Sequence, residues 1–232
     1  AAAQGYQAYS AVANGGALFK AETGTGFKTS KSQQDSRYAQ SQSNALNAGG
    51  NISILSTLNQ DVDVLALAGG GGFVGLGAAV AVVTDNSNQR AYLGDAAQIT
   101  SAANVTISAS SVRNLEISTN QAQVGAGALG ASFTRLASTG STVAETGSNI
   151  RVGQGAGTVG NLNVTAQSTV DADATTYALS AGAVAVSANF AFVEVEPTVR
   201  AGIGANGLLN LAGNAHVRAV SSGDAESKVY TL

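Results

Sequence analysis

The chain has 232 residues, of which 11% are charged and 44% hydrophobic, and its net charge is −3. With few charges and a negative net charge, the chain has no positive electrostatic field to attract nucleic acid. Its hydrophobic content is too high for a disordered chain. The chain contains no cysteine, which excludes disulfides and thiolate metal sites. Its 29 glycines and its many Ser, Thr, Val and Asn residues disfavour helix interiors, so we predict an all-β protein with closely stacked strands.

The first part of the chain is polar. Residues 15–44 are rich in Ser, Gln and Lys, and the strand-like sequence NISI follows at 51–54. We expect residues 1–60 to form a loose, polar version of the unit that repeats further along. Because the chain begins with Ala and contains no Met, we also expect it to be a piece of a longer protein.

The next element, LALAGGGGFVGLGAAVAVV, runs from Leu65 to Val83 without a charge. Nineteen apolar residues can span a bilayer as a helix, but the six glycines weaken a helix. The matching stretches further on carry Gln123, Arg135 and Glu194, which would be costly in lipid. We therefore predict buried strands with a glycine-rich bend at 69–72, and no membrane insertion.

Three sequence markers recur in one common register along the chain. The clearest is an Asn-aliphatic-polar-aliphatic strand that starts at Asn51, Asn104, Asn161 and Asn214. Alternation within this strand predicts that Val105 and Ile107 face inward. The markers divide a single array, without linkers, into 1–60, 61–113, 114–170 and 171–232. Since one such unit is longer than one coil of a typical β-helix, we expect each unit to make two or more coils.

The segment NAGGNISI at 47–54 and the polar residues before it resemble the filamentous haemagglutinin-like exoproteins of Gram-negative bacteria. The later units, with an Ala/Gly-rich stretch, an Ala-x-Ile/Leu-Gly turn and an Asn-Val-Thr-Ile strand, are similar to repeats of large leukotoxin-like surface proteins. This resemblance implies a β-solenoid (a right-handed parallel β-helix), type V export through the outer membrane, and a role in adhesion or biofilm. It carries over no catalytic residue. The glycine-rich bends leave one alternative, in which Gly-rich β-hairpin repeats stack antiparallel.

Acidic pairs recur at the repeat spacing. They are Asp61 and Asp63, Asn114 and Glu116, and Asp171 and Asp173. The two side chains of a pair share the outer face of a strand, about 7 Å apart, and stacked repeats would place the pairs in one column. Carboxylate oxygens suit Ca²⁺, so we hypothesise a calcium site at Asp61, Asp63, Glu116, Asp171 and Asp173. The alternative is a solvated acidic face that discourages aggregation, since the G-G-x-G-x-D-x-U-x calcium repeat is absent.

Other motifs point to no enzyme. Residues 125–130 match G-x-G-x-x-G, but nothing after them is typical of the helix that nucleotide binding needs. His216 is the only histidine, and Glu194 and Glu196 precede Pro197 without an aromatic platform for a sugar. The six tyrosines are scattered and predict no stacking stripe.

Together these features predict a structural and adhesive repeat segment of a large bacterial surface or secreted protein, which extends a rod for adhesion or biofilm. Two alternatives stay open: a self-assembling filament or tube, and a solenoid face that binds glycan or ice. The expected partners are other copies of the chain, adjoining repeats of a parent chain, or a glycan or protein on a host or cell surface. Nucleic acid is not expected, and the expected location is extracellular or on the bacterial cell surface.

Overall fold

The protein is built from β-strands, and its computed structural model describes residues 4–12, 19–20, 26–27, 30–37, 46–154 and 157–232. None of these residues is helical. The predicted polar unit at 1–60 lies partly outside the described residues. The strands in chain order are β1 (Gln4–Val12), β2 (Phe19–Lys20), β3 (Gly26–Phe27), β4 (Ser30–Arg37), β5 (Leu46–Asn47), β6 (Ile52–Asp85), β7 (Asn88–Leu93), β8 (Gln98–Ser138), β9 (Ser141–Thr146), β10 (Arg151–Val152), β11 (Val159–Ala181), β12 (Val184–Val195), β13 (Thr198–Gly202), β14 (Leu208–Leu209) and β15 (Ala215–Thr231).

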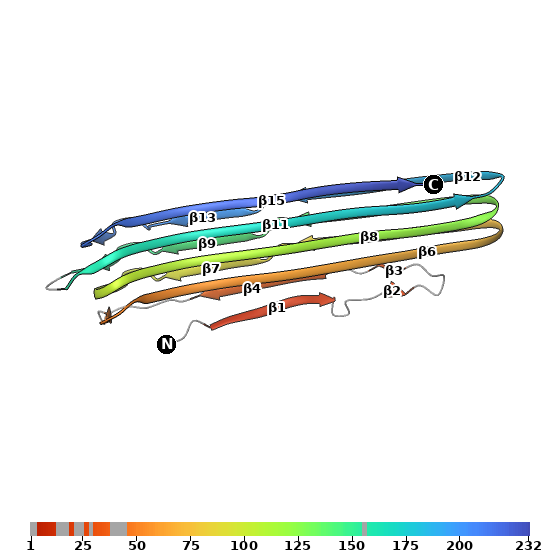
Figure 1. The fold of residues 1–232 in the computed structure, drawn as a ribbon. Helices are drawn as coiled ribbons and strands as arrows, with labels where there is room; N and C mark the ends of the chain where they lie inside the picture. The colour runs from red at the N-terminus through yellow and green to blue at the C-terminus, as the bar shows by residue number, and fades with distance from the viewer. Residues whose placement is uncertain (1–3, 13–18, 21–25, 28–29, 38–45, 155–156) are drawn as a thin grey trace.

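Successive repeats pair as parallel strands, each residue beside its equivalent. Val105 of β8 lies between Ile52 of β6 and Leu162 of β11, and Leu162 in turn pairs with Ala215 of β15. Figure 1 shows these four strands one above the other. The all-β prediction is confirmed, and the alternative of antiparallel stacking between repeats is wrong. Antiparallel pairs among the described strands join β1 to β4 and β2 to β3.

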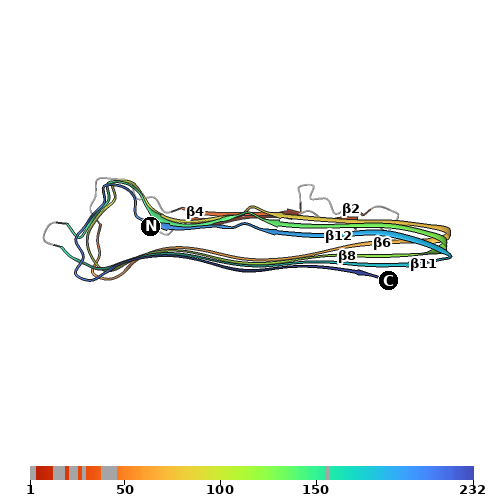
Figure 2. The same ribbon diagram turned by 90° about the horizontal axis from the view of Figure 1, so that it is seen from above.

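Each repeat makes one circuit, which corrects the expectation of two or more. In the first full repeat, β6 runs outward to the glycine-rich bend and returns, β7 continues the return, and β8 begins the next row (Figure 2). One circuit consumes so many residues because its two sides are long. The 23 residues of β11 extend over roughly 70 Å. We call the narrow end, formed by 69–75, 122–128 and 179–185, the tip, and the opposite end, where β10 and β14 lie, the head.

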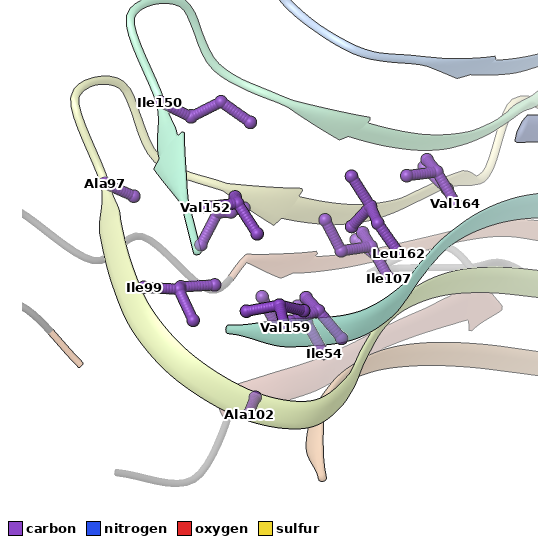
Figure 3. Close-up of a cluster of buried hydrophobic side chains, with 14 of the residues drawn as sticks. Ile54, Ala97, Ile99, Ala102, Ile107, Ile150, Val152, Val159, Leu162 and Val164 are labelled. Atoms are coloured by element: carbon purple, nitrogen blue, oxygen red, sulfur yellow. The ribbon is translucent and has the colours of Figure 1, made fainter. Parts of the chain in front are cut away.

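The head contains the larger hydrophobic core. Ile99, Ile150, Val152, Val159 and Leu162 are fully or almost fully buried there and point toward one another (Figure 3). The extra residues of the second repeat enter beside this core, as the loop-like sequence at 153–160 predicts. Val152 pairs with Ile99, whereas Val159 pairs with Ala102, so the second row has the longer connection between these two ladders. The loop can lengthen there without breaking either ladder.

The turn at the head repeats one backbone feature in three successive rows. Ala96, Asn149 and Asn206 have φ angles of 54°, 59° and 56°, in the left-handed region that ordinary side chains avoid. Asn tolerates this conformation better than Ala does. The first row therefore makes its turn at Ala96 with the least suitable side chain of the three.

The uncharged stretch 65–83 forms strands with a bend, as predicted, but fewer than half of its residues are buried. Leu65 and Leu67 are each 51% exposed and Leu76 is 63% exposed. Because side chains alternate along a strand, the apolar residues of this stretch fall on both faces. Its inner face is filled by small residues such as Ala66 and Ala79. Within the described residues, no helix has the length and hydropathy needed to cross a membrane.

Candidate functional site

An acidic double column crosses the outer face of the four long strands. In the register of the strands its members are Asp61, Asn114, Asp171 and Asp224 in one column, and Asp63, Glu116, Asp173 and Glu226 in the next. All of them are exposed except the half-buried Asp173. The predicted column is therefore confirmed. Asp224 and Glu226 were missed from the sequence, although they continue the same repeat spacing.

Like charges crowd one another along these columns. Burial raises the pKa of Asp173, and the neighbouring carboxylates of Asp171, Glu226 and Asp224 raise it further. Lys228 opposes this effect, and its ammonium donates to Glu226 at 2.5 Å. The face therefore has a negative potential that attracts cations from solution.

The five residues of the hypothesised calcium site share this face without forming one coordination shell. In the described part of the chain, no group of three or more Asp, Glu or His side chains has a geometry that could hold a metal ion. Ca²⁺ takes six to eight oxygen ligands, so water would have to complete any such site. Calcium binding stays a prediction.

A buried ion pair lies inside the slab, between two residues to which the sequence assigned no role. The Arg113 guanidinium is fully buried, and its Nε lies 3.1 Å from Oδ2 of the buried Asp85. The guanidinium also donates to the hydroxyls of Ser87, Ser111 and Ser168 at 2.9–3.0 Å. Burial lowers the pKa of Arg113, and the Asp85 carboxylate opposes that shift. The hydrogen bonds of this pair tie three rows together. Because the pair is sealed from solvent, it is not accessible to a ligand.

The other motifs from the sequence lie apart from one another. Residues 125–130 begin in the tip and continue into the return part of β8, and a Cβ on Gly125 would lie 2.6 Å from the Gly72 carbonyl oxygen. Close stacking thus explains that glycine, and β8 continues as a strand to Ser138. His216 is exposed on β15 beside Asn163. Glu194 is exposed and pairs with Arg135 at 2.9 Å.

Contacts between equivalent asparagines and between equivalent tyrosines explain why these residues recur at the repeat spacing. Asn104 Nδ2 donates to Asn51 Oδ1 at 3.0 Å, and Asn161 Nδ2 donates to Asn104 Oδ1 at 2.8 Å, so the first residue of each repeated strand links the rows. Tyr177 and Tyr230 are stacked, with ring centroids 4.9 Å apart and planes 8° from parallel. The absence of a tyrosine stripe for nucleic acid or sugar stays a prediction, but these two tyrosines are not scattered. The two tyrosines are separated by the repeat spacing, which is the signal that was overlooked.

Comparison of the chain with family models, with curated proteins and with solved structures found no match. The resemblance to haemagglutinin-like and leukotoxin-like repeats therefore stays a prediction. Function has to be inferred from the register and from the outer faces of the slab.

Proposed function

We propose that the chain is a β-solenoid segment, a right-handed parallel β-helix, of a large bacterial surface protein with a structural and adhesive role outside the cell. The in-register pairing of equivalent residues supports this proposal most directly, because it holds through β6, β8, β11 and β15. A further copy of the repeat would add a row through the same contacts. Stability would then grow nearly in proportion to the number of rows.

The shape of one row favours a broad plank over a thin rod. A whole circuit advances the stack by only about 4.8 Å, while the row itself is roughly 70 Å long. Each added repeat therefore enlarges the two flat faces considerably while lengthening the stack only slightly. This supports adhesion through the two flat faces of the slab.

Self-assembly is a second candidate, and one observation favours it. Among the described strands β15 pairs with β11 alone, and the other edge of this 17-residue strand is where a further row, of the same chain or of another copy, would pair. An exposed edge of that length is a template for pairing with another chain. Filaments grown by row-on-row addition would follow.

Light scattering coupled to size exclusion, small-angle scattering and negative-stain images of the same peak test the architecture. We expect discrete 22.8 kDa monomers. Their longest dimension should be at least about 70 Å. A compact globule of this chain length would have a radius of gyration of about 17 Å, and measuring that value would overturn the solenoid. Ordered filaments would instead establish self-assembly.

The adhesive role needs a separate test. Beads coated with the chain should bind bacterial or host cells, and beads coated with albumin serve as the control. Equal binding by the two kinds of bead would overturn the adhesive role while leaving the architecture intact.

A further inference from the structure

The distribution of side chains inverts along the slab. Toward the head, charged residues such as Asp63 lie outside and aliphatic residues such as Val64 lie inside. Toward the tip, Leu67 lies outside and Ala68 lies inside. The largest apolar side chains of the tip half therefore face solvent.

The outer face of the return strands is apolar from the tip as far as the column of Val80, Phe133 and Phe190. Phe133 and Phe192 pack with ring centroids 5.7 Å apart, and Phe190 stacks beside Phe192 at 6.4 Å. The outward residues of this face form columns in the register of β6, β8 and β12: Leu76, Leu129 and Val186; Ala78, Ala131 and Ala188; Val80, Phe133 and Phe190; and, farthest from the tip, Val82, Arg135 and Phe192. The tip itself adds Phe73, which is 85% exposed, and Val184, which is 64% exposed.

The interior of the tip half is small and polar, and several of its polar groups bond one another, whereas Asn120 Oδ1 in the Leu67 and Tyr177 column is buried without a hydrogen-bond partner. The hydroxyls of Thr119, Thr134 and Thr176 form mutual hydrogen bonds of 2.9–3.1 Å. The Ser180 hydroxyl donates to Gln123 Oε1 at 2.9 Å. Large apolar side chains outside and hydrogen-bonded polar side chains inside are the arrangement that a lipid environment selects.

Charge stops short of the tip on both faces. Residues 64–84, 117–134 and 174–193 contain no charged side chain or histidine. On one face the limit is the acidic double column in the first three rows and Lys228, one outward column closer to the tip, in the fourth. On the other face it is the Arg135–Glu194 ion pair. The stacked Tyr177 and Tyr230 lie between the acidic columns and the tip.

Contrary to the expectation from the sequence, we propose that the tip half of the slab inserts edge-on into one leaflet of a lipid bilayer with uncharged headgroups. Leu67, in the tyrosine column, lies five residues from Gly72 at the bend, or about 16 Å, which matches half of a hydrocarbon core of about 30 Å. Leu65, at the charge limit, lies seven residues from the bend, or about 23 Å, at headgroup depth. Tyrosines at the interface and charges outside it are the order found in membrane proteins.

A second copy of the chain fits these observations less well. The apolar return face covers roughly 350 Å² at standard strand and residue spacings, whereas a stable interface needs about 800 Å² per partner. A flat partner would also cover one face and leave Phe73 and the opposite face exposed. Lipid covers both faces and the tip together. The acidic columns at the limit favour uncharged headgroups over anionic ones.

Because the chain contains no Trp, a single introduced Trp reports on insertion. We would compare Phe73→Trp at the tip with Leu55→Trp, whose native residue is 56% exposed on the outer face toward the head. With phosphatidylcholine vesicles, Phe73→Trp emission should shift to the blue and be quenched by lipids brominated in the acyl chain, while Leu55→Trp emission should not change. Adding phosphatidylserine to the vesicles should weaken binding.

Matched charge variants complete the test. Phe73→Asp and Leu76→Asp should lower the vesicle partition coefficient by about tenfold or more, and Leu55→Asp should leave it unchanged. A blue shift that depends on protein concentration without lipid would overturn the proposal in favour of a second copy. No shift with vesicles, or equal losses in all three Asp variants, would also overturn it. These outcomes do not depend on the proposed adhesive role.

Discussion

Removing one partner of the buried Arg113–Asp85 pair should lower the free energy of unfolding far more than replacing both partners with apolar residues. In the single variant Arg113→Val, the Asp85 carboxylate stays buried with only the Ser87 N–H and the Ser138 hydroxyl as donors, at 3.0 and 3.1 Å. An uncompensated buried charge costs about 3–5 kcal/mol of unfolding free energy. Asp85→Val should cost a similar amount, because the guanidinium would then be buried without its anion.

The double variant should recover most of that loss. The third row already carries Val170 at the position of Arg113 and Val195 at the position of Asp85, so both sites accept Val. The remaining cost is a few serine hydroxyls without their charged partner, or about 1–3 kcal/mol. The coupling energy between the two substitutions is therefore several kcal/mol.

Urea unfolding followed by far-UV circular dichroism measures all four proteins of this cycle. Arg135→Val is the control, since its ion pair with Glu194 has the same chemistry but both side chains are 46% exposed. An exposed pair should lose at most about 1 kcal/mol. The reasoning is refuted if the two single losses simply add in the double variant, or if Arg113→Val costs no more than Arg135→Val.

Four further predictions concern the rows and their outer face. Gly140→Ala should cost about 2 kcal/mol or more in urea unfolding, because its Cβ would lie 2.1 Å from the Ser87 carbonyl oxygen; Gly127→Ala, with no atom within 4 Å, should cost nothing. Ala96→Asn should raise stability by about 0.5–1 kcal/mol by easing the left-handed turn, and an unchanged melting temperature would contradict this. Asp173→Asn should stabilise the fold at pH 7. Since the pKa of Asp173 is raised, that gain in stability should shrink as the pH falls through the ordinary Asp pKa of about 3.9. Urea midpoints of both proteins at pH 7 and at a pH below that pKa measure the change. After chelation, millimolar Ca²⁺ should raise the melting temperature, and less so in Asp61→Asn/Asp171→Asn; no rise would reject the calcium site.

Much of the row-to-row arrangement could be predicted from the sequence, because a strand ladder repeats with the sequence period. The spacing of the repeated markers predicted the column of Asp61, Asp171 and their equivalents, and it placed the insertion at 153–160. The same spacing also links Tyr177 to Tyr230 and Asp171 to Asp224, although neither link was recognised from the sequence. The number of circuits per repeat could not be predicted, because a long flat circuit and two short ones have the same alternation.

Composition and alternation by themselves determined that the chain is all-β, that its rows repeat, and which residues share a face. Only the tertiary structure decided which face is inside at each point of the row. Alternating apolar residues such as Leu67 and Ala68 satisfy the pattern in either orientation, and the choice is made by what the opposite side of the circuit can accommodate. The two sides pack through small and hydrogen-bonded side chains near the tip, so the large apolar ones are turned outward. The same packing brings Arg113 to Asp85, which lies a strand and a turn earlier in the chain, an encounter that no local pattern encodes.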